Sequence, residues 1–174
     1  MLYKTEGIII KKQNLNDLDR LLTVYSKDFG KLLIKAKSVR KNQAKLKGHL
    51  ELFLYSHLMI APGKGFDIVT GAETIESFSG LHKNLPSLAG AYYLSELTDK
   101  LIAGPEKDEH IWNLLLNSFE ELNQGKDIKN IVNDFEGKLL EYLGYGQQEN
   151  PLGFIESMIN ERIKSCLFLL NALK

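Results

Sequence analysis

The sequence predicts an α+β protein, in which a five-stranded β-barrel of the OB type is followed by an α-helical bundle. Up to about residue 78, short segments rich in β-branched residues alternate with turn residues. From residue 85 onward, apolar side chains recur at three- to four-residue spacing instead. With 44% hydrophobic and 25% charged residues, the composition is typical of a globular protein. We therefore expect two domains, residues 1–80 and residues 81–174.

Five segments of the first domain have the pattern of strands. They are residues 2–12, 20–26, 31–38, 51–61 and 66–76, with turn signals such as Asp28-Phe-Gly30 and Pro62-Gly-Lys-Gly65 between them. The one longer connection lies between the third and fourth strands, which suits a small closed or partly open OB barrel. A five-stranded SH3-like barrel would produce much the same pattern, so both remain open.

Four amphipathic helices with short connections are expected in the second domain. They cover residues 84–101, 105–124, 127–144 and 154–173. The second is expected to open at Gly104-Pro105, because proline is tolerated at the first helical position. Glu106 and Asp108 would then lie at the positive end of the helix dipole.

The charges of this neutral chain are unevenly distributed. Residues 1–80 hold 13 basic and 8 acidic side chains, and residues 81–174 hold 9 and 14. Between Lys31 and Leu50 there are seven basic residues and no acidic one. A positive segment of this kind is typical of proteins that bind a polyanion such as nucleic acid, because each phosphate contact releases counterions. It could instead solvate a loop, or face an anionic membrane or an acidic protein.

The spacing within this segment favours an exposed basic face. If residues 31–38 form a strand, Lys31, Lys35 and Lys37 share one face with Leu33. The two-residue strand repeat of about 6–7 Å roughly matches the spacing of phosphates along an extended strand. The candidate nucleic-acid-binding residues are Arg20, Lys31, Lys35, Lys37, Arg40, Lys41, Lys45 and Lys47. Arg40 adds the ability to contact phosphate through two parallel hydrogen bonds.

Three rings near this segment could stack on bases, namely those of Phe53, Tyr55 and Phe66, although a place in the barrel core is the commoner role.

Nothing in the sequence resembles an active site. The single cysteine, Cys166, excludes an internal disulfide and a multi-cysteine zinc site within one chain. The four histidines lie far apart, and Gly63-Lys-Gly65 lacks the spacing of a phosphate-binding loop. We expect no catalytic residue, no metal and no cofactor. Without a long apolar run or the apolar part of a signal peptide, a cytoplasmic location is expected.

Several segments resemble one known family. They include residues 2–12, Asn16-Asp-Leu-Asp-Arg-Leu-Leu-Thr23, Ala36-Lys-Ser-Val-Arg-Lys41, Leu46-Lys-Gly-His-Leu50, Ala72-Glu-Thr-Ile-Glu-Ser-Phe78, Tyr92-Tyr-Leu-Ser-Glu-Leu97 and Phe135-Glu-Gly-Lys-Leu-Leu-Glu-Tyr-Leu-Gly144. In this order they are similar to the RecO family of bacterial recombination mediators. The resemblance implies an OB barrel followed by a helical domain. It also implies binding of single- and double-stranded DNA, annealing of complementary strands, and help in loading recombinase onto strands coated by single-strand-binding protein. The usual protein partner is RecR.

One departure from the family concerns zinc. Many members insert a four-cysteine zinc module after the segment that corresponds to Leu143-Gly-Tyr-Gly146. Here the residues that follow, 147–154, contain no cysteine. The resemblance therefore describes a short form without the zinc module.

The resemblance also suggests that the helical domain recognises the acidic C-terminal tail of single-strand-binding protein. Since residues 81–174 carry an excess of acid, such a tail would need a local positive site. Lys100, Lys138, Arg162 and Lys164 are the candidates, and they could equally be scattered surface charges. Two other functions remain open, an RNA- or ribosome-associated OB protein and a protein-interaction module without nucleic-acid affinity.

Overall fold

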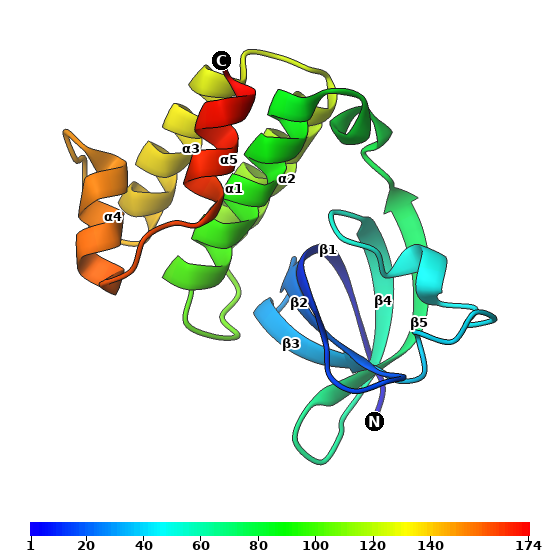
Figure 1. Ribbon diagram of the computed structural model, residues 1–174. Coiled ribbons are helices and arrows are strands. Elements are labelled where there is room, and N and C mark those ends of the chain that lie inside the picture. The colour runs from blue at the N-terminus through cyan, green and yellow to red at the C-terminus, as the bar shows by residue number, and fades with distance from the viewer. The chain divides into compact units, whose positions relative to one another are not determined.

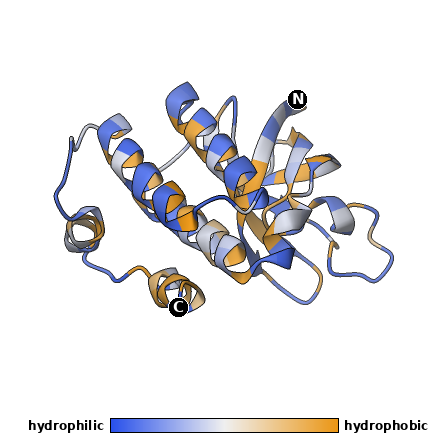
Figure 2. Ribbon diagram, turned by 90° about the horizontal axis from the view of Figure 1, so that it is seen from above, coloured by the Kyte–Doolittle hydropathy of each residue, from blue (hydrophilic) through white to orange (hydrophobic).

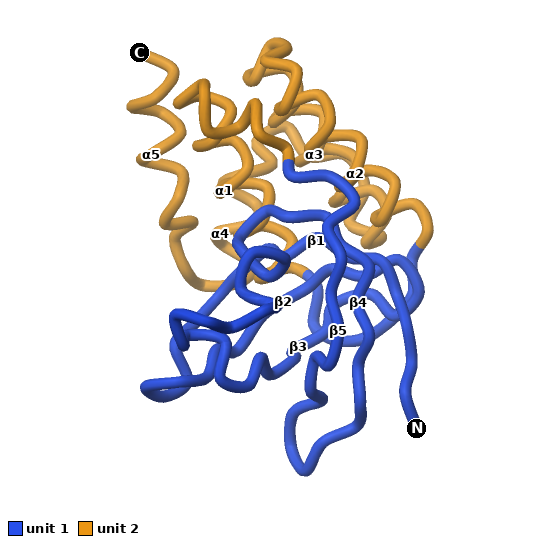
Figure 3. Tube along the Cα trace, turned by 90° about the vertical axis from the view of Figure 1, so that its right-hand side faces the viewer, with its two compact units in different colours: residues 1–77, 102–108 blue, residues 78–101, 109–174 orange.

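The computed structural model describes all residues, 1–174, and forms two compact units. The first unit contains residues 1–77 together with 102–108, and the second contains residues 78–101 and 109–174 (Figure 3). All five strands belong to the first unit and all five α-helices to the second (Figure 1). The predicted α+β class is confirmed.

The first unit is a closed barrel with the strand order β1-β2-β3-β5-β4. The strands are β1 (Tyr3–Asn14), β2 (Arg20–Ser26), β3 (Gly30–Ala36), β4 (Tyr55–Ala61) and β5 (Asp67–Glu76). The pair β3–β5 is parallel, with Ile34 opposite Asp67, and the other pairs are antiparallel. A parallel β3–β5 pair in a barrel that closes between β1 and β4 is the OB arrangement. The topology thus decides between the two barrels that the sequence left open.

Strand alternation builds the barrel core as the sequence predicts. Alternate residues of β2 and β3, such as Leu22, Val24, Ile34 and Ala36, are buried in one cluster with side chains of β1, β4 and β5. On the outer face of β3, Leu33 remains 48% exposed. The period of two places apolar residues inside and leaves the basic residues of β3 on the outside.

Two strand boundaries differ from the prediction because of left-handed residues. The third strand ends at Ala36, since Ser38 adopts a φ of 53°. The fourth strand begins at Tyr55 instead of residue 51, because Phe53 has a φ of 68°. The Phe53 ring is buried and its backbone N–H donates to the carbonyl of Ile9, so the connection is fixed to β1.

Residues 102–108 pack against the barrel instead of beginning a helix. A Cβ atom on Gly30 would lie 2.1 Å from the carbonyl oxygen of Glu106, so only glycine permits this approach. Tyr25 is fully buried nearby; burial raises the pKa of its hydroxyl, and the charges of Asp108 and Glu106 raise it further. The predicted helix start at Pro105 is therefore wrong, and α2 begins at Glu109.

The second unit is a bundle of α1 (Leu85–Leu101), α2 (Glu109–Asn123), α3 (Ile128–Tyr142), α4 (Pro151–Ile159) and α5 (Ser165–Ala172). The apolar faces of α1, α2 and α3 form its core, in which Leu97, Phe119 and Phe135 are fully buried. The carboxylate of Asp127 accepts the backbone N–H groups of Lys129 and Asn130, which fixes the start of α3.

The single helix expected over residues 154–173 is wrong, because the structure divides it into α4 and α5. Asn160 ends α4 in the left-handed conformation, with a φ of 54°. The start of α5 is capped by Glu96 of α1. One Glu96 oxygen accepts the N–H of Lys164 at 2.8 Å, and the other accepts the N–H of Ser165 at 2.7 Å and also its hydroxyl. Because this cap comes from another helix, the spacing of residues around α5 does not predict where the helix begins.

The environment of Glu96 favours its charged form. Burial raises the pKa of this carboxyl, but the hydrogen bonds from Ser165 and Lys164 and the charge of Lys100 outweigh burial and lower the pKa. The Lys100 ammonium lies 3.7 Å from Glu96. Glu96 therefore stabilises the folded chain as a carboxylate.

We predict that Glu96→Ala lowers the free energy of unfolding at pH 7 by about 1–2 kcal/mol, as expected for the loss of a helix cap. Because the folded pKa is depressed, the stabilisation is present above the usual value of 4.5 and is lost as the pH falls below it. Urea denaturation from pH 3 to 8 measures this difference. Glu120→Ala, on an exposed side chain of α2, is the control, and an equal loss in both variants would contradict the prediction.

Candidate nucleic-acid interface

The loop between β1 and β2, residues 15–19, is folded by its own side chains. The amide oxygen of Asn16 accepts the backbone N–H groups of Leu18 at 2.9 Å and of Asp19 at 2.8 Å. The N–H of Leu15 donates to the carbonyl of Asp19. Asparagine favours such turns because its short side chain reaches the backbone two or three residues on. The turn that follows β3 is bonded to this loop through Ser38 and Arg40.

The Asp19 carboxylate holds the turn of residues 37–40 against that loop. One of its oxygens accepts the N–H of Ser38 at 2.8 Å, and the other lies 3.0 Å from the Lys35 ammonium and accepts the Asn16 amide. Arg40 adds two further bonds, from its N–H to the carbonyl of Leu18 and from its guanidinium to the carbonyl of Asn16. The basic segment therefore leaves the barrel in a fixed direction.

These bonds lower the pKa of the Asp19 carboxyl. The N–H of Ser38, followed by the Asn16 amide and the Lys35 ammonium, holds the pKa of Asp19 well below its usual range. Asp19 is thus charged at any physiological pH; the Lys35 ammonium balances this charge, and the two neutral donors stabilise it by hydrogen bonds.

Acidic side chains from outside residues 31–50 pair with some of the candidate DNA-binding residues. Lys35 is paired with Asp19, and the guanidinium of Arg20 lies 3.3 Å from a Glu51 oxygen. Glu51 also pairs with Lys12. These acids come from segments before and after the basic segment, which residue counting within 31–50 does not include.

Four of the eight candidate cations have no ion pair or side-chain hydrogen bond, namely Lys37, Lys41, Lys45 and Lys47. All four lie in the connection between β3 and β4, where Lys37, Lys41 and Lys45 are exposed and Lys47 is half-buried. Arg40 has no acidic partner, because its guanidinium donates to a carbonyl oxygen. Lys31 lies on β3 opposite Tyr25. The structure thus concentrates the unneutralised positive charge in residues 37–47, beyond the end of β3.

Exposed apolar side chains occur on the same barrel. Leu15 and Leu18 project from the β1–β2 loop, and Leu33 and Phe66 are 48% and 39% exposed. Because Ile34 is opposite Asp67, Leu33 and Phe66 lie at neighbouring positions of β3 and the start of β5. Of the three rings singled out for stacking, Phe53 is in the core and the hydroxyl of Tyr55 donates to Glu6 at 2.6 Å. The two loop leucines were missed, since alternation patterns carry no information on loop side chains.

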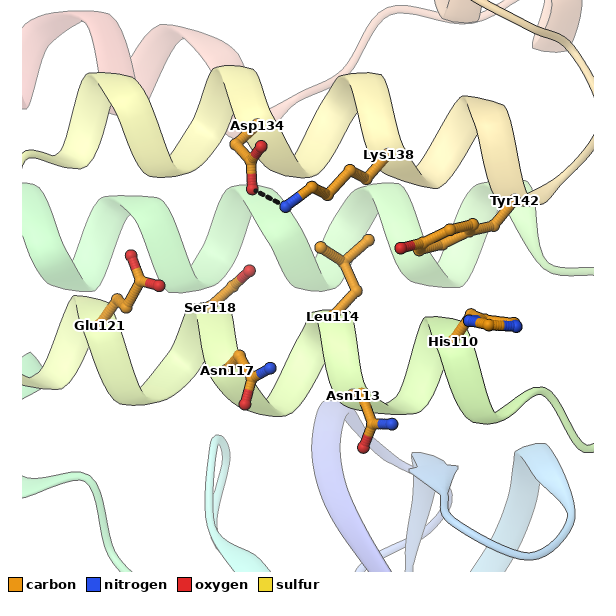
Figure 4. A pocket seen from close by; sticks show the side chains of 9 residues that line it. All are labelled: His110, Asn113, Leu114, Asn117, Ser118, Glu121, Asp134, Lys138 and Tyr142. Atoms are coloured by element: carbon orange, nitrogen blue, oxygen red, sulfur yellow. Dashed lines mark ion pairs between the residues drawn. The ribbon is translucent and has the colours of Figure 1, made fainter.

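The four candidate residues for docking the tail of single-strand-binding protein lie at two places in the helical unit. Lys100 lies within 2.5 Å of Glu161, which places it beside the α4–α5 connection that contains Arg162 and Lys164. Lys138 lies instead in a groove of about 200 Å³ between α2 and α3, where its ammonium is 2.9 Å from Asp134 (Figure 4). The structure brings three of these four cations toward one connection.

No group of three or more His, Cys, Asp or Glu side chains is arranged to hold a metal ion. None of the helices is both long and apolar enough to cross a membrane.

Comparison with known protein families identifies the family of this chain. Residues 1–78 match the family described as Recombination protein O N terminal, and residues 82–150 match Recombination protein O C terminal. The chain belongs to the RecO family. The expectation from the resemblance is therefore confirmed at the level of the family, across both the barrel and most of the helical part.

Several RecO relatives show how much of the chain is shared. The protein named DNA repair protein RecO from Dehalococcoides mccartyi (strain ATCC BAA-2266 / KCTC 15142 / 195) is 40% identical over 143 residues, which cover 82% of this chain and 56% of the relative. The protein of the same name from Roseiflexus sp. (strain RS-1) is 34% identical over 146 residues, with 84% and 51% covered. This chain thus spans about half the length of the relatives it matches.

We predict that Asp19→Asn releases the turn of residues 37–40. The amide keeps the size of the side chain but loses the charge that the three donors stabilise. In the unsubstituted protein, the depressed pKa means that the contact is complete above the usual value of 3.8 and weakens as the pH falls below it. The backbone N–H signal of Ser38 in nitrogen-15 NMR spectra, with its rate of hydrogen exchange, measures the release. Asp17→Asn, two residues away and exposed, should leave Ser38 unchanged, and slow exchange that persists in Asp19→Asn would contradict the role of the carboxylate.

Proposed function

We propose that this RecO-family chain is a DNA-binding mediator of recombinational repair. In this proposal, residues 1–80 form the nucleic-acid-binding domain and residues 81–174 the helical domain. The chain binds single- and double-stranded DNA, anneals complementary strands and helps to load recombinase onto strands coated by single-strand-binding protein. It acts in the bacterial cytoplasm at the nucleoid, through reversible contacts, with no covalent step and no cofactor.

One observation carries the proposal: the Asp19 carboxylate fixes a turn from which Lys37, Lys41, Lys45 and Lys47 extend without acidic partners. Cations held by a rigid base lose less entropy on binding than cations on a free loop. Each phosphate that they neutralise releases condensed counterions, which favours association with either form of DNA.

The exposed apolar residues favour unpaired bases as a second type of contact. Leu33 and Phe66 lie on the barrel that carries the basic segment, and bases of a single strand can pack or stack on such side chains. Bases in a duplex are stacked on each other and are not available for this contact. The proposed interface thus combines phosphate contacts, which both forms share, with base contacts that favour single strands.

The family supports two protein partners, a RecR-type recombination protein and the C-terminal tail of single-strand-binding protein. For the tail, we propose the surface around the α4–α5 connection, where Lys100, Arg162 and Lys164 lie. Arg162 and Lys164 are exposed, and Met158 offers an exposed apolar side chain on the preceding helix. Lys100 contributes less, because Glu96 and Glu161 already neutralise it.

For the DNA interface, we predict a salt-dependent affinity for single-stranded DNA. If about five phosphates are neutralised, log K falls with log salt at a slope of about −3.5. Replacing Lys37, Lys41 and Lys45 together by alanine should make the slope about 2 less steep. Fluorescence anisotropy of a labelled oligonucleotide between 50 and 300 mM salt measures both values.

The control for this series is the variant Lys4→Ala, Lys126→Ala, Lys174→Ala, which changes the net charge equally at exposed lysines outside the segment. It should keep the slope. Equal slopes in the two triple variants would place the DNA site elsewhere, and equal or tighter binding of a matched RNA strand would favour an RNA-associated protein instead.

For the tail, we predict micromolar binding of a labelled acidic, apolar peptide to the full chain. Charge reversal by Arg162→Glu or Lys164→Glu should weaken it about ten-fold, because the short-range contacts to these side chains are lost. Lys138→Glu, in the separate groove between α2 and α3, is the matched control and should bind as before. If all three reversals weaken binding alike, the effect is one of net charge and the proposed surface is wrong.

A further inference from the structure

The helical unit contains a cavity, apart from the groove between α2 and α3, that the proposed function does not use. It has a volume of about 330 Å³ and lies among α1, α3, α4 and α5. Its walls are largely apolar and include Leu152 of α4 and Leu169, Leu170 and Leu173 of α5. A concave apolar site of this size that encloses a few polar groups is the usual form of a binding site.

A buried carboxyl group forms the polar part of this cavity. Glu136 of α3 is 8% exposed and lines the cavity, and its Oε1 accepts the hydroxyl of Tyr93 at 2.5 Å. Tyr93 is its only hydrogen-bonding partner, so Oε2 has no partner within the protein. Burial raises the pKa of Glu136, and the Tyr93 hydrogen bond offsets only part of this effect. A buried carboxylate with one partner is costly, and a cation bound beside it would reduce that cost.

The charges and the shape around the cavity indicate the charge and the size of its ligand. The exposed Glu149 and Lys129 also line it, so that acids exceed bases by one. Leu170 and Leu173 line the cavity and are still 55% and 39% exposed, so apolar side chains of α5 are also accessible beside it. Figure 2 shows the helix at the C-terminus largely in the hydrophobic colours. An apolar surface that extends beyond a cavity fits a protein segment better than a compact small molecule.

We propose that this cavity binds a protein segment that carries an apolar side chain next to a lysine or arginine. The apolar side chain fills the space between α4 and α5, and the cationic nitrogen pairs with Oε2 of Glu136. Glu136 lies within residues 82–150, which match the family, and part of the apolar wall lies in residues 151–173 beyond that match. None of the residues that line this site belongs to the basic segment of the barrel.

Three matched peptides test the proposal on the full chain: acetyl-Leu-Lys-Leu-amide, acetyl-Leu-Gln-Leu-amide and acetyl-Leu-Glu-Leu-amide. Titrations at pH 8, followed by NMR shifts of amide groups in α3 and α5, should give millimolar dissociation constants. The lysine peptide should bind about ten-fold tighter than the glutamine peptide, and the glutamate peptide should bind most weakly. Equal affinities, tighter binding of the glutamate peptide, or no shifts in α3 and α5 would each overturn the proposal.

Two substitutions test whether Glu136 causes the preference for the lysine peptide. Glu136→Gln keeps the size of the side chain and should abolish the preference for lysine over glutamine while leaving the glutamine peptide bound. Glu141→Gln, at an exposed position of the same helix outside the cavity, removes the same charge and should keep the preference. If Glu136→Gln does not fold, the comparison of the three peptides on the unsubstituted chain still decides. A lysine preference that survives in folded Glu136→Gln would overturn the role of this carboxyl.

Discussion

The Asp19 carboxylate is the contact on which the arrangement of the basic interface depends. It is the point where the β1–β2 loop, the end of β3 and the following turn meet, through Asn16, Lys35 and Ser38. Without it, residues 37–47 would be held on the barrel by the hydrogen bonds of Arg40 and by the apolar side chains of Val39 and Leu46. A single acid thus fixes the start of this segment, whose charged residues are all basic, because it holds the turn that follows β3 against the barrel.

The same contact shows why charge counting along the sequence overestimates the interface. Lys35 and Arg20 have the right charge and the right strand position, but acids that are distant in sequence neutralise them. What remains is a shorter group of lysines in the connection. The proposed interface therefore lies in the connection instead of the strand, because of tertiary ion pairs that a count within residues 31–50 does not include.

The barrel was largely predictable, since a period of two and clear turn residues determine five strands and their inner faces. Its OB topology was not, because it depends on the parallel contact of Ile34 with Asp67 between segments far apart in the chain. The helical half was less predictable wherever a distant partner intervenes. Glu96 caps α5 from another helix, and Gly30 allows Glu106 to pack on the barrel where Pro105 alone predicts a helix start. Such contacts override local propensity without changing the apolar spacing.

The chain belongs to the RecO family, and the geometry of its barrel supports the proposal that it binds nucleic acid. The central claim is that the lysines beyond β3, fixed by Asp19, are the first contact with DNA. The most direct measurement is an NMR titration of lysine side-chain ammonium groups with a single-stranded oligonucleotide. The account predicts that Lys37, Lys41 and Lys45 shift first, while Lys27, which is paired with Glu6, stays unchanged. If the first shifts come from lysines of the helical unit, the account of the interface is contradicted.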